Sequence, residues 1–278
     1  RGPLTRSANT SPKAAADGAE RAAKAVFFLG GRLARGVLKM IAILLQHGTL
    51  VGGKVVVIPV NTNTVKWYVT DITPQYSPRA FGAVPRLGIG DRQTSTVWPG
   101  VIEALKMIGG PAESMQHSAY RELAPMDIIL SRPGAEVTYL PGHGSLNIGH
   151  TGSSIEGFWL TGVLCHIEQG CTEPYGADLD HVPVKSADSA GIAKAKGLIN
   201  RGRHYTFFTL DTSFVFDFSK TSLPERYDTA IDAAVEMYNH IKQLKNGEAF
   251  DFEFSLDEGE EITEPEELRY VLDELTKK

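Results

Sequence analysis

The sequence has few cysteines, no long apolar run and no excess of basic residues. Its 278 residues include two cysteines, Cys165 and Cys171. This count is typical of the reducing cytoplasm and argues against a disulfide-stapled secreted domain. The apolar segment at residues 37–45 contains Lys39 and is too short to span a bilayer. Near the N-terminus, no apolar stretch is followed by a small-residue cleavage site. We therefore expect a cytoplasmic protein with no membrane partner.

The charge balance excludes a second group of functions. The formal net charge is -5 and the pI about 5.9, so the chain lacks the basic character of a nucleic-acid-binding protein. The segment Gly142-His143-Gly144 lacks the lysine and the spacing of a phosphate-binding loop, which argues against nucleotide binding. A hydrophobic content of 42% allows a sizeable core, in one large domain or two smaller ones.

The first third of the chain is expected to form a tail followed by a small α+β region. Residues 1–18 are rich in Ser, Pro, Ala and Gly and predict a flexible tail. Residues 19–78 predict an N-terminal helix and a β-hairpin. The hairpin strands are expected at 54–60 and 65–72, around Asn61-Thr62-Asn63-Thr64. The proline-containing connector 74–85 predicts a domain boundary, after which residues 79–278 form the main domain.

From residue 86 onward, strand-like and helical patterns alternate. A glycine-rich stretch at 131–157, longer than an ordinary connection, predicts a lid, a binding loop or disorder. Residue 263 is expected to cap the last helix, because Pro265 and Glu266 follow it. Strands alternating with helices predict an α/β fold with a barrel-like sheet. The strands are expected to end near residues 92, 181, 210 and 256, and the helices to cover 99–107, 158–169, 223–244 and 263–278.

The densest polar cluster consists of Glu173, Asp178, Asp180 and His181, at the end of one apolar segment. In an α/β barrel, polar residues at the carboxyl end of a strand carry the chemistry. The functional interpretation makes His181 a ligand of a divalent metal, beside a carboxylate that acts as a base or second ligand. The alternative is a polar loop that caps the next helix.

Other polar residues follow further strands, and each has a structural alternative. Glu258 stands after the strand at 250–256 and suits acid–base chemistry, but it also belongs to a solvated acidic run. Asp211 is catalytic or, more in keeping with its position, a helix cap. Arg92, beside two glycines, either holds a substrate carboxylate or lies in a surface turn. His117 and His166 lie on apolar segments and are expected to be packed histidines.

Taken together, five stretches resemble the tagaturonate epimerase family (UxaE type) and occur in that family's order. The resemblance implies a barrel that binds a divalent cation (Mn, Zn, Co or similar) and interconverts the keto-uronates D-tagaturonate and D-fructuronate. It makes His181 a metal ligand, Asp178 or Asp180 a catalytic carboxylate, and Glu258 its partner acid. Of the two aspartates we assign catalysis to Asp178, and we expect Arg92, Arg121, Asp180 and Asp211 to bind the substrate. The stretches are 86–92 with the helix from Pro99, 116–123, 162–181, 205–213 and 254–271.

The sequence also departs from that family. The family continues beyond the point corresponding to Lys278 and carries further histidines there, whereas this sequence supplies about five of the eight strands of a closed barrel. We therefore expect a partial TIM-like (β/α) barrel, preceded by the small α+β region. Such a chain is incomplete and lacks a C-terminal part, or it self-associates through its exposed strand edge. The alternatives to an epimerase are a non-catalytic scaffold of that fold and a metal-dependent aldolase-like lyase.

Overall fold

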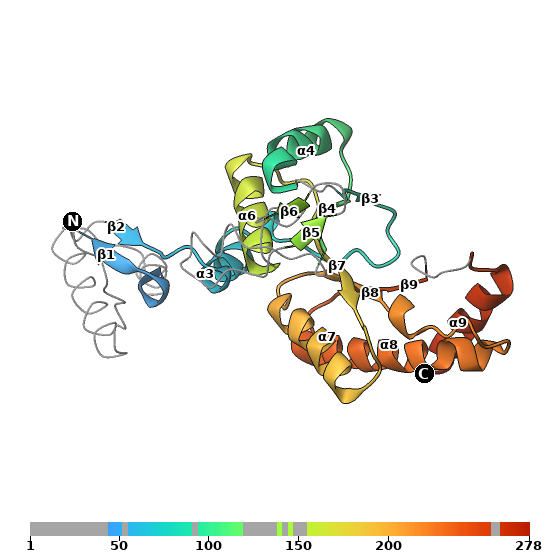
Figure 1. Ribbon diagram of the computed structural model, residues 1–278. Coiled ribbons are helices and arrows are strands. Elements are labelled where there is room, and N and C mark those ends of the chain that lie inside the picture. Colours follow the sequence, from blue (N-terminus) through green and yellow to red (C-terminus); the bar gives the residue numbers. More distant parts are fainter. Residues whose placement is uncertain are drawn as a thin grey trace, which may run out of the picture. The chain divides into compact units, whose positions relative to one another are not determined.

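The structure is a computed structural model in which two compact units are described separately (Figure 1). The units are Arg1–Thr64 and Val65–Lys278. In the described part of the chain, no helix is both long and apolar enough to cross a membrane. The residues that the structure describes are 44–51, 55–90, 94–118, 138–140, 144–146, 155–256 and 262–278.

In the first unit, a short antiparallel pair forms earlier in the chain than expected. Strand β1 (Thr49–Val51) pairs with β2 (Val55–Val57), and helix α3 (Thr62–Trp67) follows. The predicted hairpin of 54–60 with 65–72 was therefore wrong. The Asn61 side chain accepts hydrogen bonds from the backbone N–H groups of Asn63 and Thr64, each at 3.0 Å. This is the contact of a helix cap, and it converts the expected turn into a helix start.

The second unit is built on a five-stranded parallel sheet with the strand order β3-β4-β7-β8-β9. Each strand lies beside the next one of this sheet along the chain, and helices connect them (Figure 1). This arrangement confirms the α/β fold class and the partial TIM-like barrel. The strands are β3 (Leu87–Gly88), β4 (Ala112–Ser118), β7 (Tyr175–Pro183), β8 (Phe207–Asp211) and β9 (Asp251–Ser255). The helices are α4 (Thr94–Ile108), α6 (Ile155–Glu168), α7 (Ser189–Arg201), α8 (Leu223–Lys245) and α9 (Pro265–Lys277).

The stretch that we expected to be a long loop contains a second small sheet. Strand β5 (Thr138–Leu140) pairs antiparallel with β6 (Gly144–Leu146), and α6 begins at Ile155. A role for this stretch as a lid or a binding loop stays a prediction.

The last helix begins one residue later than predicted. Its N-cap is Glu264, which forms a capping box with Glu267, so the assignment of residue 263 as the cap was wrong.

The core lies between one face of the sheet and the helices. Alternate strand residues, such as Leu179 and Phe208, are buried there with Trp98, Phe158 and Met237 of the helices. Helix α6 is buried on most sides, which explains why its sequence is apolar nearly all round. Because side chains alternate across a strand, burying this set directs the intervening residues to the opposite, inner face of the half-barrel.

The proline-containing connector packs against the amino ends of the strands. The N–H of Arg79 donates to the carbonyl of Tyr175 at 3.0 Å. The N–H groups of Phe81 and Gly82 donate to the Asp251 carboxylate at 2.8 Å each. Residues 79–82 therefore pack against the amino ends of β7 and β9. The domain boundary that the sequence placed in this connector stays a prediction.

Candidate active site

The inner face of the half-barrel is polar from β4 to β9. Gln116 of β4 is in register with Asp178 of β7, and Thr209 of β8 with Glu253 of β9. Each of these residues alternates along its strand with one that packs against the helices. A closed barrel buries such a face, and enzymes of this fold use its carboxyl end for chemistry. This face is therefore the candidate active site.

Asp178 lies at the centre of this face and is almost fully buried. Its carboxylate accepts a hydrogen bond from the Gln116 amide at 3.3 Å and from the Thr209 hydroxyl at 3.2 Å. Burial raises the pKa of Asp178 well above its usual range, and the neighbouring Asp180 raises it further, while the Gln116 hydrogen bond lowers it. Burial therefore favours the protonated form of Asp178 relative to that of an exposed aspartate.

His181 has a strained backbone. Its φ is 53°, in the left-handed region that side chains other than glycine rarely adopt. The pairing of β7 with β8 shifts between Leu179 and Val182, so this residue lies in a β-bulge. The bulge leaves its imidazole half-exposed, with Nε2 3.7 Å from the Asp180 carboxylate. Bulges and strained residues of this kind cluster at functional sites, where they redirect a side chain.

Asp211 ends β8 and stabilises the turn that follows. One of its carboxylate oxygens accepts hydrogen bonds from the backbone N–H of Ser213 at 3.0 Å and from its hydroxyl at 2.6 Å. These contacts stabilise the turn that leads into the 3-10 helix Ser213–Val215. The N-cap of that helix is Thr212, so the assignment of Asp211 as the helix cap was wrong. The side chain alternates with Thr209 and so shares the inner face. A contact of Asp211 with substrate stays a prediction.

A second polar cluster closes the amino end of the inner face. The Arg86 guanidinium lies between the carboxylates of Glu113 and Asp251, at 2.8 and 3.1 Å. It also lies over the ring of Phe207, 5.0 Å from its centroid. Burial raises the pKa of Glu113 to about 7, although Arg86 lowers it, and Asp251 raises it further. Gly176 leaves room for the Glu113 carboxylate, because an added Cβ would lie 2.0 Å from its Oε2.

The structure brings together some of the predicted site residues and leaves others undescribed. Asp178, Asp180, His181 and Asp211 lie on β7 and β8, whereas Arg92, Arg121 and Glu258 lie outside the described residues. Gln116, Thr209 and the Arg86 cluster were not predicted from the sequence. The only sequence signal for Thr209 was the alternation of side chains between the two faces of a strand. No sequence signal connected Arg86 to carboxylates that are distant in the chain.

The two histidines on apolar segments are packed, as expected. His117 is buried against the ring of Phe158, with the ring centroids 5.0 Å apart. His166 stacks on Tyr175 with the centroids 3.7 Å apart, and its ring nitrogens lie 2.8 Å from the Gly162 carbonyl and 3.1 Å from the Ser114 hydroxyl. Burial lowers the pKa of His166 to about 4, so this imidazole is neutral in the core.

Neither a protein-family model nor a curated protein matches the sequence. Among solved structures, the fold has a counterpart: the glycerol-complexed crystal structure of fructuronate-tagaturonate epimerase UxaE from Cohnella laeviribosi. The two chains share 19% sequence identity, and the TM-score is 0.54. The match covers 84% of this chain and 50% of the epimerase, so this chain spans about half the epimerase's length. The resemblance inferred from the sequence is thereby confirmed for the fold: the chain is similar to one half of this epimerase.

Proposed function

We propose that the chain is part of a metal-dependent epimerase that interconverts D-tagaturonate and D-fructuronate. The observation that carries the proposal is the fold match to the fructuronate-tagaturonate epimerase, in a half-barrel whose inner face is lined with acid–base groups. The strained His181 and two aspartates lie within four residues of one another on β7. Fold alone does not define an activity, so the assignment also depends on the chemistry of the site residues.

The two aspartates of β7 occupy different environments, which suits them to different steps of proton transfer. Asp178 is buried, and burial raises its pKa well above the usual range, which favours its protonated form. Asp180, two residues further along the strand, is more exposed and lies beside His181. Pairs of carboxyl groups in such contrasting environments divide the roles of acid and base in many enzymes. We assign proton donation to Asp178, positioned by Gln116 and Thr209.

The two keto-uronates differ at a hydroxyl-bearing carbon that is β to the ketone. Removing the hydroxyl proton allows the adjacent C–C bond to break in the retro-aldol direction, and re-addition to the opposite face inverts the centre. This route requires a group that takes the hydroxyl proton and another that returns one. In our proposal, Asp178 and Glu258 exchange these protons, and Arg92 or Arg121 binds the substrate carboxylate.

The residues that the structure describes supply part of a metal site. His181 and Asp180 offer an imidazole and a carboxylate 3.7 Å apart. Within the described ranges, no group of three His, Cys, Asp or Glu side chains is placed to hold a metal ion. Protein sites for zinc use at least three protein ligands, so a cation at His181 needs a ligand from elsewhere. When bound, such a cation supplies Lewis-acid polarisation of a carbonyl group.

The test is conversion of D-tagaturonate to D-fructuronate by the purified chain, with and without added manganese, zinc or cobalt. If activity is detected, D178N should lower turnover by about 10²–10⁴-fold, the share of a general acid. The matched control D273N changes an exposed aspartate of α9 and should leave turnover unchanged. Equal turnover of D178N and wild type would remove Asp178 from the mechanism.

Two outcomes would favour the alternative functions. Cleavage products in place of the epimer would indicate a lyase of the aldolase type. If metal analysis finds no bound divalent ion and no conversion occurs under any condition, this chain alone is not an active epimerase, which favours the scaffold. The observation that favours the scaffold is the sheet itself, which has five strands among the described residues where a closed barrel of this type has eight.

A further inference from the structure

Two glycines border the candidate active site at the first strand of the sheet. Gly88 ends β3, and Gly90 follows it two residues later. A Cβ added to Gly88 would lie 3.6 Å from the side-chain oxygen of Gln116, and one added to Gly90 would lie 3.4 Å from the same atom. Gln116 contacts Asp178 on the inner face of the half-barrel. Both glycines therefore present their backbone to this inner face.

The fold itself requires glycine at neither position. Neither residue has the positive φ that favours glycine, and β3 pairs with β4 without a register shift. In the described part of the chain, Gln116 Oε1 is the only atom within 4 Å of either added Cβ, and both distances are those of ordinary contact. Glycine in a strand costs stability and often marks a bulge or the close approach of a ligand or another backbone. With no bulge and no close backbone among the described residues, these two glycines indicate a ligand.

The side-chain amide of Gln116 indicates what kind of group this ligand carries. Its Nε2 donates to Asp178 Oδ2 at 3.3 Å, whereas no group of the described residues donates to its Oε1. Gly88 and Gly90 are exposed, so this oxygen lies beside open backbone at the inner face. An amide oxygen is a hydrogen-bond acceptor only. Its complement is therefore a donor such as a hydroxyl group.

The same amide connects this oxygen to the proposed proton donor. Because Oε1 and Nε2 belong to one planar group, a hydroxyl group bound at Oε1 lies beside Asp178 Oδ2. The Thr209 hydroxyl, 3.2 Å from Asp178 Oδ1, holds the carboxyl group from the neighbouring strand. Asp178 therefore has a fixed position relative to a ligand hydroxyl at Gln116. A hydroxylated chain that lies over Gly88 and Gly90 brings its carbons within reach of this acid.

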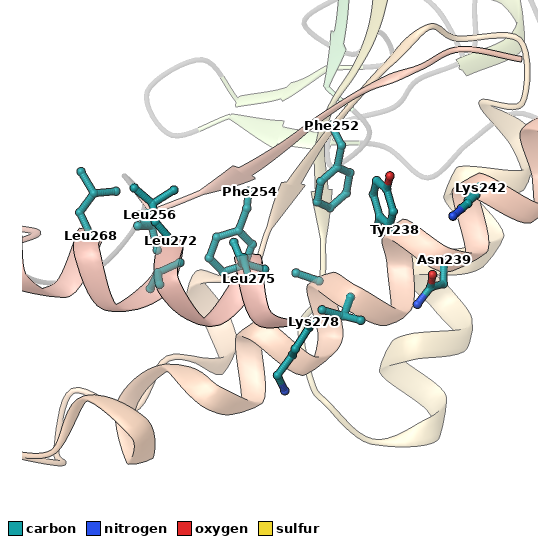
Figure 2. Close-up of a pocket in the computed structure, with 13 residues that line it drawn as sticks. Tyr238, Asn239, Lys242, Phe252, Phe254, Leu256, Leu268, Leu272, Leu275 and Lys278 are labelled. Carbon is teal, nitrogen blue, oxygen red and sulfur yellow. The ribbon is translucent and has the colours of Figure 1, made fainter. Parts of the chain in front are cut away.

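An apolar groove elsewhere in this unit suits a hydroxylated ligand poorly. It lies between α8, β9 and α9 and has a volume of about 580 Å³. Figure 2 shows Phe252 and Phe254 of β9 and Leu268, Leu272 and Leu275 of α9 along this groove. Hydroxyl groups that leave water for such an apolar surface lose hydrogen bonds without replacement. The inner face, with its amide and carboxyl groups, provides those hydrogen-bond partners.

We propose that Gln116 determines substrate specificity: its Oε1 accepts a hydrogen bond from a hydroxyl group of the keto-uronate, whose carbon chain lies over Gly88 and Gly90. A site that binds a hydroxyl group by a hydrogen bond discriminates against analogues that lack it. The identity of the ligand rests on the proposed epimerase function, whereas the hydrogen bond itself requires only a hydroxylated chain. This role is additional to the positioning of Asp178.

The test is binding of D-tagaturonate to the purified chain, measured by titration calorimetry and by NMR, neither of which needs turnover. The NMR signals of the Gln116 side-chain amide are identified by their loss in Q116L, and in wild type they should shift as D-tagaturonate is added. G90A, whose Cβ occupies the space of the ligand chain, should raise Kd by about tenfold or more. Q116L should raise Kd by about tenfold. The control G197A, exposed on α7 with open space around it, should bind like wild type.

Kinetics separate recognition of the substrate from positioning of the acid. G90A retains the hydrogen bond between Gln116 and Asp178, so it should raise KM and leave kcat and the pH profile unchanged. Burial raises the pKa of Asp178, and the Gln116 hydrogen bond lowers it. Q116L should therefore also move the limb of the pH profile that reports this acid to higher pH.

The outcomes distinguish this inference from the proposed function. If the chain binds D-tagaturonate without converting it and G90A weakens the binding, the inference stands and the epimerase proposal loses support. If folded G90A binds as tightly as wild type, or if wild type binds no D-tagaturonate, the inference is overturned, whether or not epimerisation is detected. Circular dichroism shows whether a variant is folded, and G88A replaces G90A if that variant unfolds.

Discussion

Replacing Glu113 with glutamine should remove a pH-dependent loss of stability. The carboxyl group is buried beneath the inner face, and its pKa rises from 4.5 to about 7. Between these values the folded state binds more protons than the unfolded state. Stability therefore falls as pH rises through this window and changes no further above it. At about 1.4 kcal/mol per pKa unit, the full loss is about 3 kcal/mol.

The measurement is urea unfolding of wild type and E113Q from about pH 5 to about pH 8, followed by circular dichroism. Other titrating groups are common to both proteins, so the difference in free energy of unfolding isolates Glu113. Over this range, wild type should lose about 2.5 kcal/mol relative to E113Q. The exposed Glu266 of α9 provides the matched control, E266Q, whose difference from wild type should vary far less. A difference between wild type and E113Q that stays constant with pH would refute the assigned burial of this carboxyl group.

Two further substitutions test the geometry of β7. G176A places a Cβ 2.0 Å from the Glu113 carboxylate and should destabilise the fold by about 1–3 kcal/mol in urea unfolding. The control G197A changes an exposed position of α7 with open space around it and should stabilise the fold by about 0.5–1 kcal/mol. If both variants behave alike, the packing over Gly176 is not as tight as described. H181N relieves part of the left-handed backbone strain and should raise the free energy of unfolding by up to about 1 kcal/mol. The same substitution should abolish any epimerase activity. A variant that is both active and more stable would show that His181 has no catalytic role.

The repeating pattern of the sheet could be predicted from the sequence because each strand and helix is encoded locally. Helix α8 shows a helical spacing of apolar residues and ends at Asn246, whose φ is 47°, followed by glycine. The segment after Asn61 was misassigned because its β-branched residues favour strands, whereas a single side-chain cap commits it to a helix. The intrinsic preference of a residue for strand or helix is a weak predictor of structure compared with such a hydrogen bond.

The candidate site could be predicted only where its residues are close in the sequence. Asp178, Asp180 and His181 stand together on β7, so their proximity was visible without a structure. Gln116 and Thr209 contact Asp178 across strand registers that no local pattern determines. The same limit applies to Arg86, whose carboxylate partners lie on β4 and β9.

The two ends of the inner face have different physical roles. At the amino end, the Arg86 guanidinium forms ion pairs with two carboxylates, and the backbone N–H groups of Phe81 and Gly82 donate hydrogen bonds to one of them. Such a network fixes the spacing of β4 and β9 and favours rigidity over chemistry. At the other end, His181 is held in a strained bulge and its side chain is 32% exposed. Strain of this kind persists only when the surrounding structure is rigid. The amino-end network therefore supplies the rigidity that the candidate active site requires.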